Sequence, residues 1–510
     1  MDVEKKINYG FVSFITVLIF IIVKIILSHF IGLGNDESYY WTYAEQLQIN
    51  YFDHPPIIAL WIKIFTLNLW LDDFIFFLRL GSFVGCALSA YFMYKLVTML
   101  STARAGWIAV VLYNCSLYAS LNAGLMVMPD APQMVFFTAS LYAIVLIIKH
   151  DKKKSNWLWF GLLSGLAIMS KVHAVFLWVG VVGYAILYAR QWLTNWLFYA
   201  AMGITALVIS PILIWNIQYD FITFRFHGDR VKVGEQNVIH WYGLLKELVG
   251  QLIINNPINV VISYLFIFYP PSIRYAKGAT KLFILIAAPL LLCIIYLALF
   301  KEALPHWSGP VYVCLIPIAA IGLSQVKYAL GQGIIKTNLT YTFFVLVGLV
   351  YAIQFYPGTF SNSTLPQYGK NDISLDAYGW QEAGAEFKKI YEKNCDANKQ
   401  NKSPIICNTW WGAHDEFYFA KPLQAPTIGL GKINEIHHYY WRNAAQAAKA
   451  AMDTGFCLVH SYDYYDAIGT NKQYYHKVDS IATITITRGN KPAYYFYVYR
   501  LIGFKNNFLF

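Results

Sequence analysis

Apolar runs long enough to cross a membrane recur along the first 356 of the chain's 510 residues. A helix needs about 20 apolar residues to span the hydrocarbon core of a bilayer. The composition agrees, because 57% of the residues are hydrophobic and only 13% are charged, whereas soluble domains carry about 25% charged residues. The sequence therefore predicts an α-helical polytopic membrane protein and excludes an ordinary soluble enzyme.

About eleven transmembrane helices are expected. They are predicted near residues 11–31, 77–100, 105–126, 131–149, 157–169, 172–189, 194–216, 247–269, 281–300, 309–325 and 339–356. The fifth and sixth are short enough to form one kinked or re-entrant element instead. The chief ionisable residue within the spans is Lys24, which we expect to reach the membrane surface from a helix end. A transporter normally places ionisable residues near the midplane, so this pattern favours another class of membrane protein.

Lysine and arginine residues gather in short loops on one side of the predicted spans, for example from Lys152 to Lys154. Cytoplasmic loops carry such an excess, so this side is predicted to be cytoplasmic. The same loops account for the net charge of +11, and no nucleic-acid partner is expected. The opposite side holds the loops 32–76 and 217–246 and the C-terminal region.

The composition changes at Gly358, after which no apolar run reaches spanning length. We therefore predict a transmembrane domain over residues 1–357 and a small soluble α/β or α+β domain over residues 358–510. Within the second domain, helices are predicted at 382–393 and 444–451, and strands at 405–407, 456–460, 481–487 and 494–501. Its cysteines are Cys395, Cys407 and Cys457. The sequence does not decide between a disulfide linking two of them and three free thiols.

The first outer loop carries Asp36 and Glu37 after Asn35, followed by an aromatic stripe that includes Tyr40. This pattern predicts a helix that lies flat at the membrane surface, with Asn35 as its N-cap. The two acids could form part of a site or could merely stabilise the first turn of that helix. Farther along the loop, Tyr51, Phe52, Asp53 and His54 precede a double proline, which favours the start of a second helix.

Further polar side chains occur at the outer ends of the predicted spans. Each has a structural alternative: Asp130 could be a helix cap, Lys171 beside His173 could extend to the surface, and Trp307 could be an interfacial anchor. The segment with Arg225 and Arg230 could bind a phosphate or lipid headgroups. The remaining candidate is His306, which precedes Trp307.

Acids, histidines and arginines thus gather on one face of the membrane, where an enzyme acting on a lipid headgroup would place its chemistry. Outside the cytoplasm no nucleotide-activated sugar is expected, so a glycosyl transferase there needs a donor carried on a membrane lipid. Two alternatives remain: a transporter or flippase of lipid-linked saccharide, and a non-catalytic scaffold. Internal repeats, which would favour transport, are absent from the sequence.

The order of these motifs resembles the GT-C membrane glycosyltransferases, as a bacterial relative of the dolichyl-phosphate-mannose protein mannosyltransferases and of lipid A aminoarabinose transferase. The motifs that carry the resemblance are Asp36-Glu37, Tyr51-Phe52-Asp53-His54-Pro55-Pro56, Met128-Pro129-Asp130-Ala131-Pro132, Pro305-His306-Trp307 and His437-His438-Tyr439-Tyr440-Trp441. The resemblance implies transfer of a sugar, with inversion, from a polyprenyl-phosphate donor to lipid A, a glycan or a protein. It also implies a place in the inner membrane, with the C-terminal domain outside the cytoplasm.

The resemblance also assigns roles. The family's key carboxylate matches Asp36, with Glu37 beside it, and its second acidic position matches Asp130. A histidine, His54, stands where the aminoarabinose transferases have a phosphate-contacting lysine, so a permanent positive charge is missing there.

Acceptor activation is assigned to Asp36 as general base. The candidate cations for the leaving phosphate are Lys171, Arg225, Arg230 and a protonated His54. We assign substrate contacts to Tyr40, Tyr51, Asp53, His306 and Trp307. No cofactor is required by this chemistry; Mg²⁺ held by Asp36, Asp130 or His54 is an optional addition.

Overall fold

The computed structural model describes residues 7–149, 153–231, 239–270, 274–361, 364–395 and 401–505, without the side chains of Arg230 and residues 274–276. Two compact units make up the chain. The first, here called the helical unit, comprises Met1–Ile26 and Leu47–Val345, and the second, the sheet unit, comprises Leu27–Gln46 and Leu346–Phe510. The predicted boundary at residues 357/358 falls inside the sheet unit.

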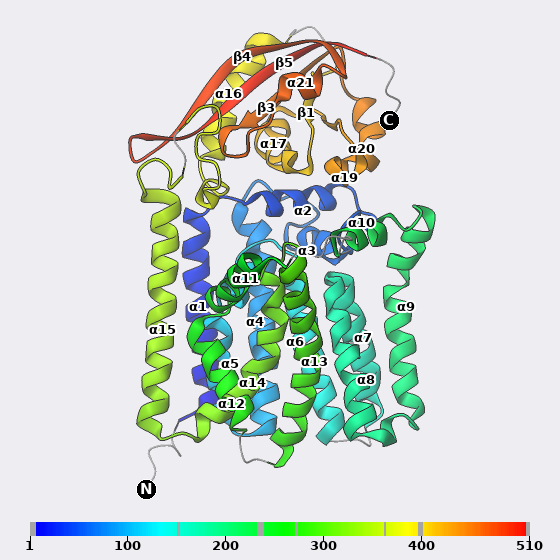
Figure 1. Cartoon of the computed structure of the whole chain (residues 1–510), viewed down its shortest axis with the longest axis vertical. Coiled ribbons are helices and arrows are strands. Elements are labelled where there is room, and N and C mark those ends of the chain that lie inside the picture. Colours follow the sequence, from blue (N-terminus) through cyan, green and yellow to red (C-terminus); the bar gives the residue numbers. More distant parts are fainter. Residues whose placement is uncertain are drawn as a thin grey trace. The chain divides into compact units, whose positions relative to one another are not determined.

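The helical unit is built almost entirely of α-helices, several of which run side by side in Figure 1. α1 and α15 each have most of their length in it. Its helices are α1 (Tyr9–Phe30), α3 (Ile57–Phe65), α4 (Ile75–Leu100), α5 (Ala103–Cys115), α6 (Asp130–Lys149), α7 (Ser155–Ser170), α8 (Phe176–Tyr188), α9 (Trp196–Gln218), α10 (Ile222–Val231), α11 (Trp241–Ile254), α12 (Pro257–Phe268), α13 (Arg274–Phe300), α14 (Gly309–Gln325) and α15 (Tyr328–Val350).

The predicted multi-pass architecture is confirmed. Among the described residues, seven helical segments are long and apolar enough to cross a membrane, and α11 with α12 makes an eighth if this pair, bent by 98°, forms one span. The predicted spans at 105–126, 157–169 and 172–189 correspond to the shorter helices α5, α7 and α8. The first of these ends early, because the chain leaves the helix at Ser116 and re-enters a π-helical turn at Tyr118–Asn122.

The predicted span at 247–269 is divided at Asn256, whose φ of 69° lies in the left-handed region. Pro257 then starts α12, where its missing N–H costs no helical hydrogen bond. The Asn256 side-chain amide donates to the Cys115 carbonyl at 3.0 Å and to Asn338 Oδ1 at 2.6 Å. The break is therefore stabilised by buried polar contacts with two neighbouring helices.

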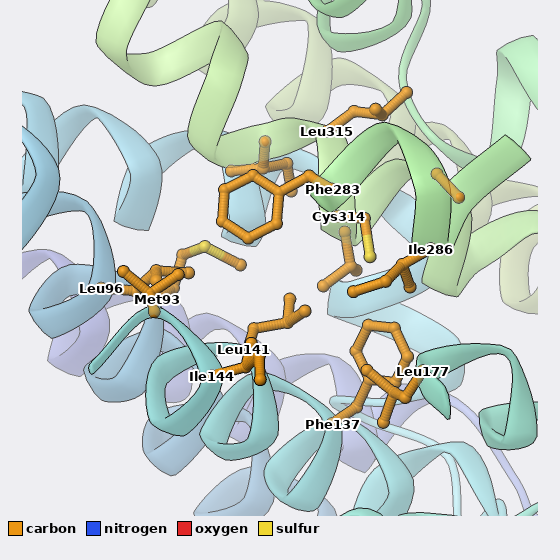
Figure 2. Packing of buried hydrophobic residues seen from close by; sticks show 14 of the residues in the cluster. Met93, Leu96, Phe137, Leu141, Ile144, Leu177, Phe283, Ile286, Cys314 and Leu315 are labelled. Carbon is orange, nitrogen blue, oxygen red and sulfur yellow. The ribbon is translucent and has the colours of Figure 1, made fainter. Parts of the chain in front are cut away.

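Apolar side chains from five helices interdigitate at the centre of the helical unit (Figure 2). They include Met93 of α4, Phe137 of α6, Leu177 of α8, Phe283 of α13 and Leu315 of α14. At the contact between α8 and α13, a Cβ on Gly180 would lie 2.5 Å from the Ile286 Cα, so only glycine allows this approach.

The expectation that Lys24 reaches the membrane surface is wrong. Its side chain is 1% exposed. The ammonium lies 2.8 Å from the Cys86 Sγ and 3.3 Å from the Asn114 Oδ1. The lysine points into the helical unit because these two polar side chains, on α4 and α5, supply its hydrogen-bond partners.

The sheet unit contains one mixed five-stranded sheet of order β2-β1-β3-β5-β4. Its strands are β1 (Ile405–Cys407), β2 (Thr427–Gly429), β3 (Thr454–His460), β4 (Tyr475–Arg488) and β5 (Lys491–Phe504). β1 is parallel to β2 and β3, whereas β5 is antiparallel to β3 and β4. The long β4–β5 hairpin, red in Figure 1, turns at Gly489 and Asn490, both with positive φ. The predicted α/β character is confirmed.

The sheet unit also contains the helices α2 (Asn35–Glu45), α16 (Trp380–Asn394), α17 (Ala413–Asp415), α18 (Lys421–Leu423), α19 (Ile433–Ile436), α20 (Tyr439–Ala447) and α21 (Ala467–Asn471). The four predicted strands and the helix at 382–393 are present, and the helix predicted at 444–451 instead begins at Tyr439 and ends at Ala447. β2 was not predicted.

All seven cysteines are free. β1 and β3 are parallel neighbours in which Ile405 is level with Phe456, so Cys457 is level with Ile406. Because side chains alternate along a strand, Cys407 and Cys457 lie on opposite faces of the sheet. A disulfide between them is thereby excluded in this fold.

Candidate functional site

The acids of the first outer loop lie in the first turn of α2, as predicted, but this helix is packed into the sheet unit and does not lie free at a surface. Its N-cap is Gly34, and Asn35 is its first residue. Glu37 is buried and accepts a hydrogen bond from the Gly34 backbone N–H at 2.8 Å. Asp36 is partly exposed. Glu37 therefore has the geometry of a capping residue, whereas Asp36 has the accessibility that a reacting carboxylate needs.

Tyr40, predicted to contact substrate, is buried in this helix packing. Its ring centroid lies 5.7 Å from those of Tyr39 and Tyr43. The Tyr39 ring in turn lies 5.1 Å from Trp410 of the sheet unit. These edge and tilted contacts are the usual geometry of an aromatic core, so the position of Tyr40 is that of a packing residue.

The loop that contains Tyr51 and Asp53 is held by its own hydrogen bonds and by α10. Tyr51 is fully buried, and its hydroxyl accepts from the Gln48 N–H at 3.2 Å. The carbonyl of Asp53 lies 3.0 Å from the His227 Nε2. His227 was not among the predicted site residues, although it lies in the same basic segment as Arg225.

A buried ion pair at the start of α6 is the strongest polar feature of the helical unit. Both carboxylate oxygens of Asp130 lie within 3.0 Å of the Lys171 ammonium, at 3.0 and 2.8 Å. The Tyr118 hydroxyl donates to Asp130 Oδ1 at 2.8 Å. Asp130 is fully buried and Lys171 is 7% exposed. Asp130 therefore does more than cap a helix, and Tyr118, which the sequence did not indicate, completes its coordination.

The chain brings Lys171 to this position by ending α7 at Ser170. The Lys171 backbone is extended, and a 3₁₀ turn over Val172–Val175 follows before α8 begins. The Gln133 side-chain amide, on α6, donates to the Lys171 carbonyl at 3.3 Å. The break between the predicted fifth and sixth spans thus places the Lys171 side chain next to the first turn of α6.

Three histidines surround the ion pair within electrostatic range. His54, His173 and His306 each interact with both Asp130 and Lys171, and His306 lies in the 3₁₀ turn Pro305–Ser308. The helical unit therefore gathers four of the predicted site residues from distant segments of the chain, together with His173. This set of residues, Asp130, Lys171, His54, His173 and His306, is called the Asp130 cluster below.

The protonation of His54 differs from the expectation. Its pKa is lowered to about 4, chiefly by burial; Asp53 opposes this shift, Lys171 and His227 add to it, and Asp130 opposes it. His54 is therefore neutral at pH 7 in the free protein, and a protonated His54 facing the donor phosphate stays a prediction. Lys171 is the charged member of the cluster next to Asp130.

Two other predicted residues have contacts of a different kind. Arg225, on α10, is exposed and donates to the carbonyl of Asp220. Trp307 packs against the apolar core of the helical unit. The Arg230 side chain lies outside the described residues, so its predicted role in phosphate binding stays a prediction.

No group of three or more His, Cys, Asp or Glu side chains is placed to hold a metal ion in the part of the chain that the structure describes. The optional Mg²⁺ ion stays a prediction.

Comparison with known proteins gives matches by sequence and by structure. The model of the family described as dolichyl-phosphate-mannose-protein mannosyltransferase matches residues 53–215, a segment that contains His54, Asp130 and Lys171. Over its whole length, the structure is similar to the crystal structure of ArnT from Cupriavidus metallidurans bound to undecaprenyl phosphate, with a TM-score of 0.65, 11% sequence identity, and coverage of 97% of this chain and 98% of that chain. The chain has the GT-C fold.

Two curated relatives agree with this GT-C assignment. The lipid A galacturonosyltransferase RgtD of Rhizobium johnstonii is 23% identical over 304 residues, which cover 58% of this chain and 61% of the relative. The undecaprenyl phosphate-α-4-amino-4-deoxy-L-arabinose arabinosyl transferase of Yersinia enterocolitica is 29% identical over 135 residues, or 26% of this chain and 24% of the relative. The matched regions therefore span less than two thirds of either relative. The predicted resemblance to GT-C membrane glycosyltransferases is confirmed.

Proposed function

We propose that this chain is an inverting glycosyltransferase that moves a sugar from a polyprenyl-phosphate donor to an acceptor of the cell envelope, namely lipid A, a glycan or a protein. Both curated relatives are named as transferases, and neither name supports the transporter alternative. The similar ArnT structure holds undecaprenyl phosphate, which is the kind of donor lipid that the proposal requires.

The Asp130 cluster is the observation that carries the proposal. A phosphate group in a site shielded from water needs a nearby cation and several N–H donors. Lys171 supplies the cation, and the imidazoles of His54, His173 and His306 each carry at least one N–H. Asp130 already neutralises the charge of Lys171. Binding of a dianionic phosphate therefore requires that Lys171 moves toward the phosphate or that one of the histidines becomes protonated.

The proposed reaction is a single displacement at the anomeric carbon. The Asp36 carboxylate accepts the proton of the acceptor hydroxyl while the acceptor oxygen bonds to that carbon. The bond between the anomeric carbon and the phosphate oxygen breaks, its electron pair leaves with the polyprenyl phosphate, and the configuration inverts. The leaving dianion needs little acid catalysis, and neither an organic cofactor nor a metal ion is required by this scheme.

The proposed location is the inner membrane, with the sheet unit on the outer side. The positive charges of the loops on the other side support this orientation. A donor carried on a lipid suits chemistry in a compartment without nucleotide sugars.

Transfer of radiolabelled sugar tests the proposal directly. The purified full-length protein in lipid nanodiscs is mixed with polyprenyl-phosphate sugars and an envelope extract, with and without EDTA. Asp36→Asn is compared with Asp479→Asn, a matched change of a partly exposed carboxylate on β4. We expect transfer by the wild type and by Asp479→Asn, in both buffers, and a loss of at least 100-fold in Asp36→Asn. No transfer from any donor, with donor binding intact, would refute the proposed activity.

A further inference from the structure

The helix that carries Asp36 is short and depends on tertiary contacts for its stability. α2 spans only 11 residues, and isolated helices of this length are marginal in water. It belongs to the sheet unit, with Leu346–Phe510, although it lies near the start of the chain. Polar contacts hold both of its ends, buried at the N-terminal end and partly buried at the C-terminal end, and the proposed function uses neither of them.

The C-terminal end of α2 is held by a buried arginine. Arg442 of α20 is 2% exposed and forms a two-pronged pair with Glu416, through Nη1–Oε2 at 2.8 Å and Nη2–Oε1 at 2.6 Å. The same Nη2 donates to Glu45, the last residue of α2. The Arg442 guanidinium is thus shared between two carboxylates of the sheet unit, that of Glu416 and that of Glu45 in α2. Such charge-assisted pairs are stronger and more directional than neutral hydrogen bonds.

The N-terminal end of α2 is held by a buried histidine and an aspartate. The His414 Nδ1 lies 3.1 Å from the Asn35 side-chain oxygen, and its Nε2 lies 3.0 Å from the Leu33 carbonyl and 3.1 Å from the Asp376 carbonyl. The Asn35 backbone N–H donates to the Asp376 carboxylate at 3.1 Å. A Cβ on Gly32 would lie 2.8 Å from the Ala377 carbonyl oxygen, so the chain could not approach this closely with another residue.

The tautomer of His414 follows from these partners. Its pKa lies well below the ordinary value because the ring is buried, so the ring is neutral and carries one N–H. Two carbonyl oxygens face Nε2, which must therefore be the donor. Nδ1 then accepts, which requires the Asn35 amide to be turned so that Nδ2 and not Oδ1 faces the ring; Nδ2 otherwise has no partner among the described residues.

We infer that these two contacts make the sheet unit a positioning device for Asp36, with Glu45, Arg442 and His414 as positioning residues. The anchors lie at residues 35 and 45, about 15 Å apart along the helix axis. One anchor would leave the helix free to pivot, whereas two anchors fix both its direction and its rotation. Asp36 follows Asn35 directly, so its backbone lies next to the N-terminal anchor. This inference rests on the proposed function for its catalytic consequence and on the contacts alone for the anchoring.

Glu45→Ala separates anchoring from general destabilisation. Arg442 keeps its two-pronged partner Glu416, so the variant leaves no buried charge unpaired. Alanine favours helix formation. Apart from the lost contact, this change should therefore strengthen α2. The matched control is Glu386→Ala, which removes an exposed glutamate paired with Lys389 on α16.

Amide hydrogen exchange of the full-length protein in nanodiscs measures the anchoring, and sugar transfer measures its consequence. In Glu45→Ala we expect exchange within residues 36–45 to accelerate about tenfold, since a hydrogen bond to a charged group contributes about 1.5–3 kcal/mol. We expect kcat to fall at least fivefold with less than a twofold change in the KM for the donor, because the proposed phosphate site is in the helical unit. Glu45→Gln keeps a hydrogen-bond acceptor and should restore part of the exchange protection and part of kcat. Glu386→Ala should match the wild type in both measurements.

Unchanged exchange of residues 36–45 in Glu45→Ala would overturn the anchoring. Faster exchange with an unchanged kcat would overturn the positioning role. A wild-type protein that transfers no sugar would instead refute the proposed function, and the exchange data would still decide whether the sheet unit holds α2.

Discussion

Replacement of Asp376 by asparagine should change how the stability of the protein depends on pH. Burial raises the pKa of Asp376 from its ordinary 3.8 to about 7; the Asn35 N–H opposes this rise, and the charges of Asp36 and Glu37 add to it. The folded state thus holds a proton that the unfolded chain releases above pH 4. The contribution of Asp376 to the unfolding free energy is therefore fully present below pH 4 and is lost as the pH rises from about 4 to 7.

The rise from 3.8 to about 7 corresponds to about 4 kcal/mol of unfolding free energy. Because the Asp376 side chain is partly accessible, solvent screening reduces this value, and we expect about 2–3 kcal/mol. Asparagine has the shape of the protonated acid and keeps an oxygen for the Asn35 N–H, but it carries no charge. Asp376→Asn should therefore match the wild type at pH 4 and exceed its stability at pH 8.

Thermal unfolding of the full-length protein in detergent, followed by tryptophan fluorescence from pH 4 to 8, measures this difference. A gain of 2–3 kcal/mol should raise the unfolding temperature of a domain of this size by roughly 4–12 °C at pH 8. Asp479→Asn, which changes a partly exposed carboxylate of β4, should show no such pH-dependent gain. Parallel pH profiles for Asp376→Asn and the wild type would refute the reasoning.

Three further predictions concern the Asp130 cluster. Lys171→Met leaves Asp130 buried without its cation and should lower the unfolding free energy by about 3–5 kcal/mol, measured by denaturation in detergent. Lys171→Met combined with Asp130→Asn should regain most of this loss. A double variant as unstable as the single one would contradict the pairing. Gly309→Ala should lower activity more than tenfold, because its Cβ would lie 2.3 Å from the Tyr118 ring and displace the hydroxyl that contacts Asp130; a fully active variant would contradict this, and circular dichroism checks that the variant folds. Since the pKa of His54 is about 4 in the free protein and a bound dianion should raise it, affinity for polyprenyl phosphate should increase as the pH falls from 7 to 5. A binding titration should show this increase reduced in His54→Gln, and equal pH dependence in both proteins would exclude proton uptake by His54.

Local patterns predicted the elements whose residues follow a clear period. The apolar runs located the long helices α4, α6 and α9, and β-branched and aromatic residues located β3 and β5. β2 was missed because three residues show no alternation. The bend at Asn256 was missed although Asn255, Asn256 and Pro257 interrupt the apolar run there, a pattern that commonly ends one helix and starts the next.

The sequence also placed Asp130 and Lys171 among the site residues, since both are charged residues at helix ends. It could not show that they pair, because that contact depends on how α6 packs against α7. Tyr118 has no signal of its own within an apolar stretch. Lys24 was misjudged for a similar reason: a lysine near a helix end extends to the surface unless neighbouring helices offer it partners, and Cys86 and Asn114 do.

The membership of α2 in the sheet unit has a consequence for biogenesis. Asn35 and its partner His414 are separated by 379 positions, so the helix leaves the ribosome long before the residues that hold it. Contacts between distant segments close slowly, and domains synthesised later fold later. The membrane helices can therefore assemble first, whereas the segment with Asp36 reaches its final position only after the C-terminal residues have been synthesised. Truncation within Leu346–Phe510 should thus yield an inserted protein without the proposed activity, so that this activity would depend on completion of synthesis.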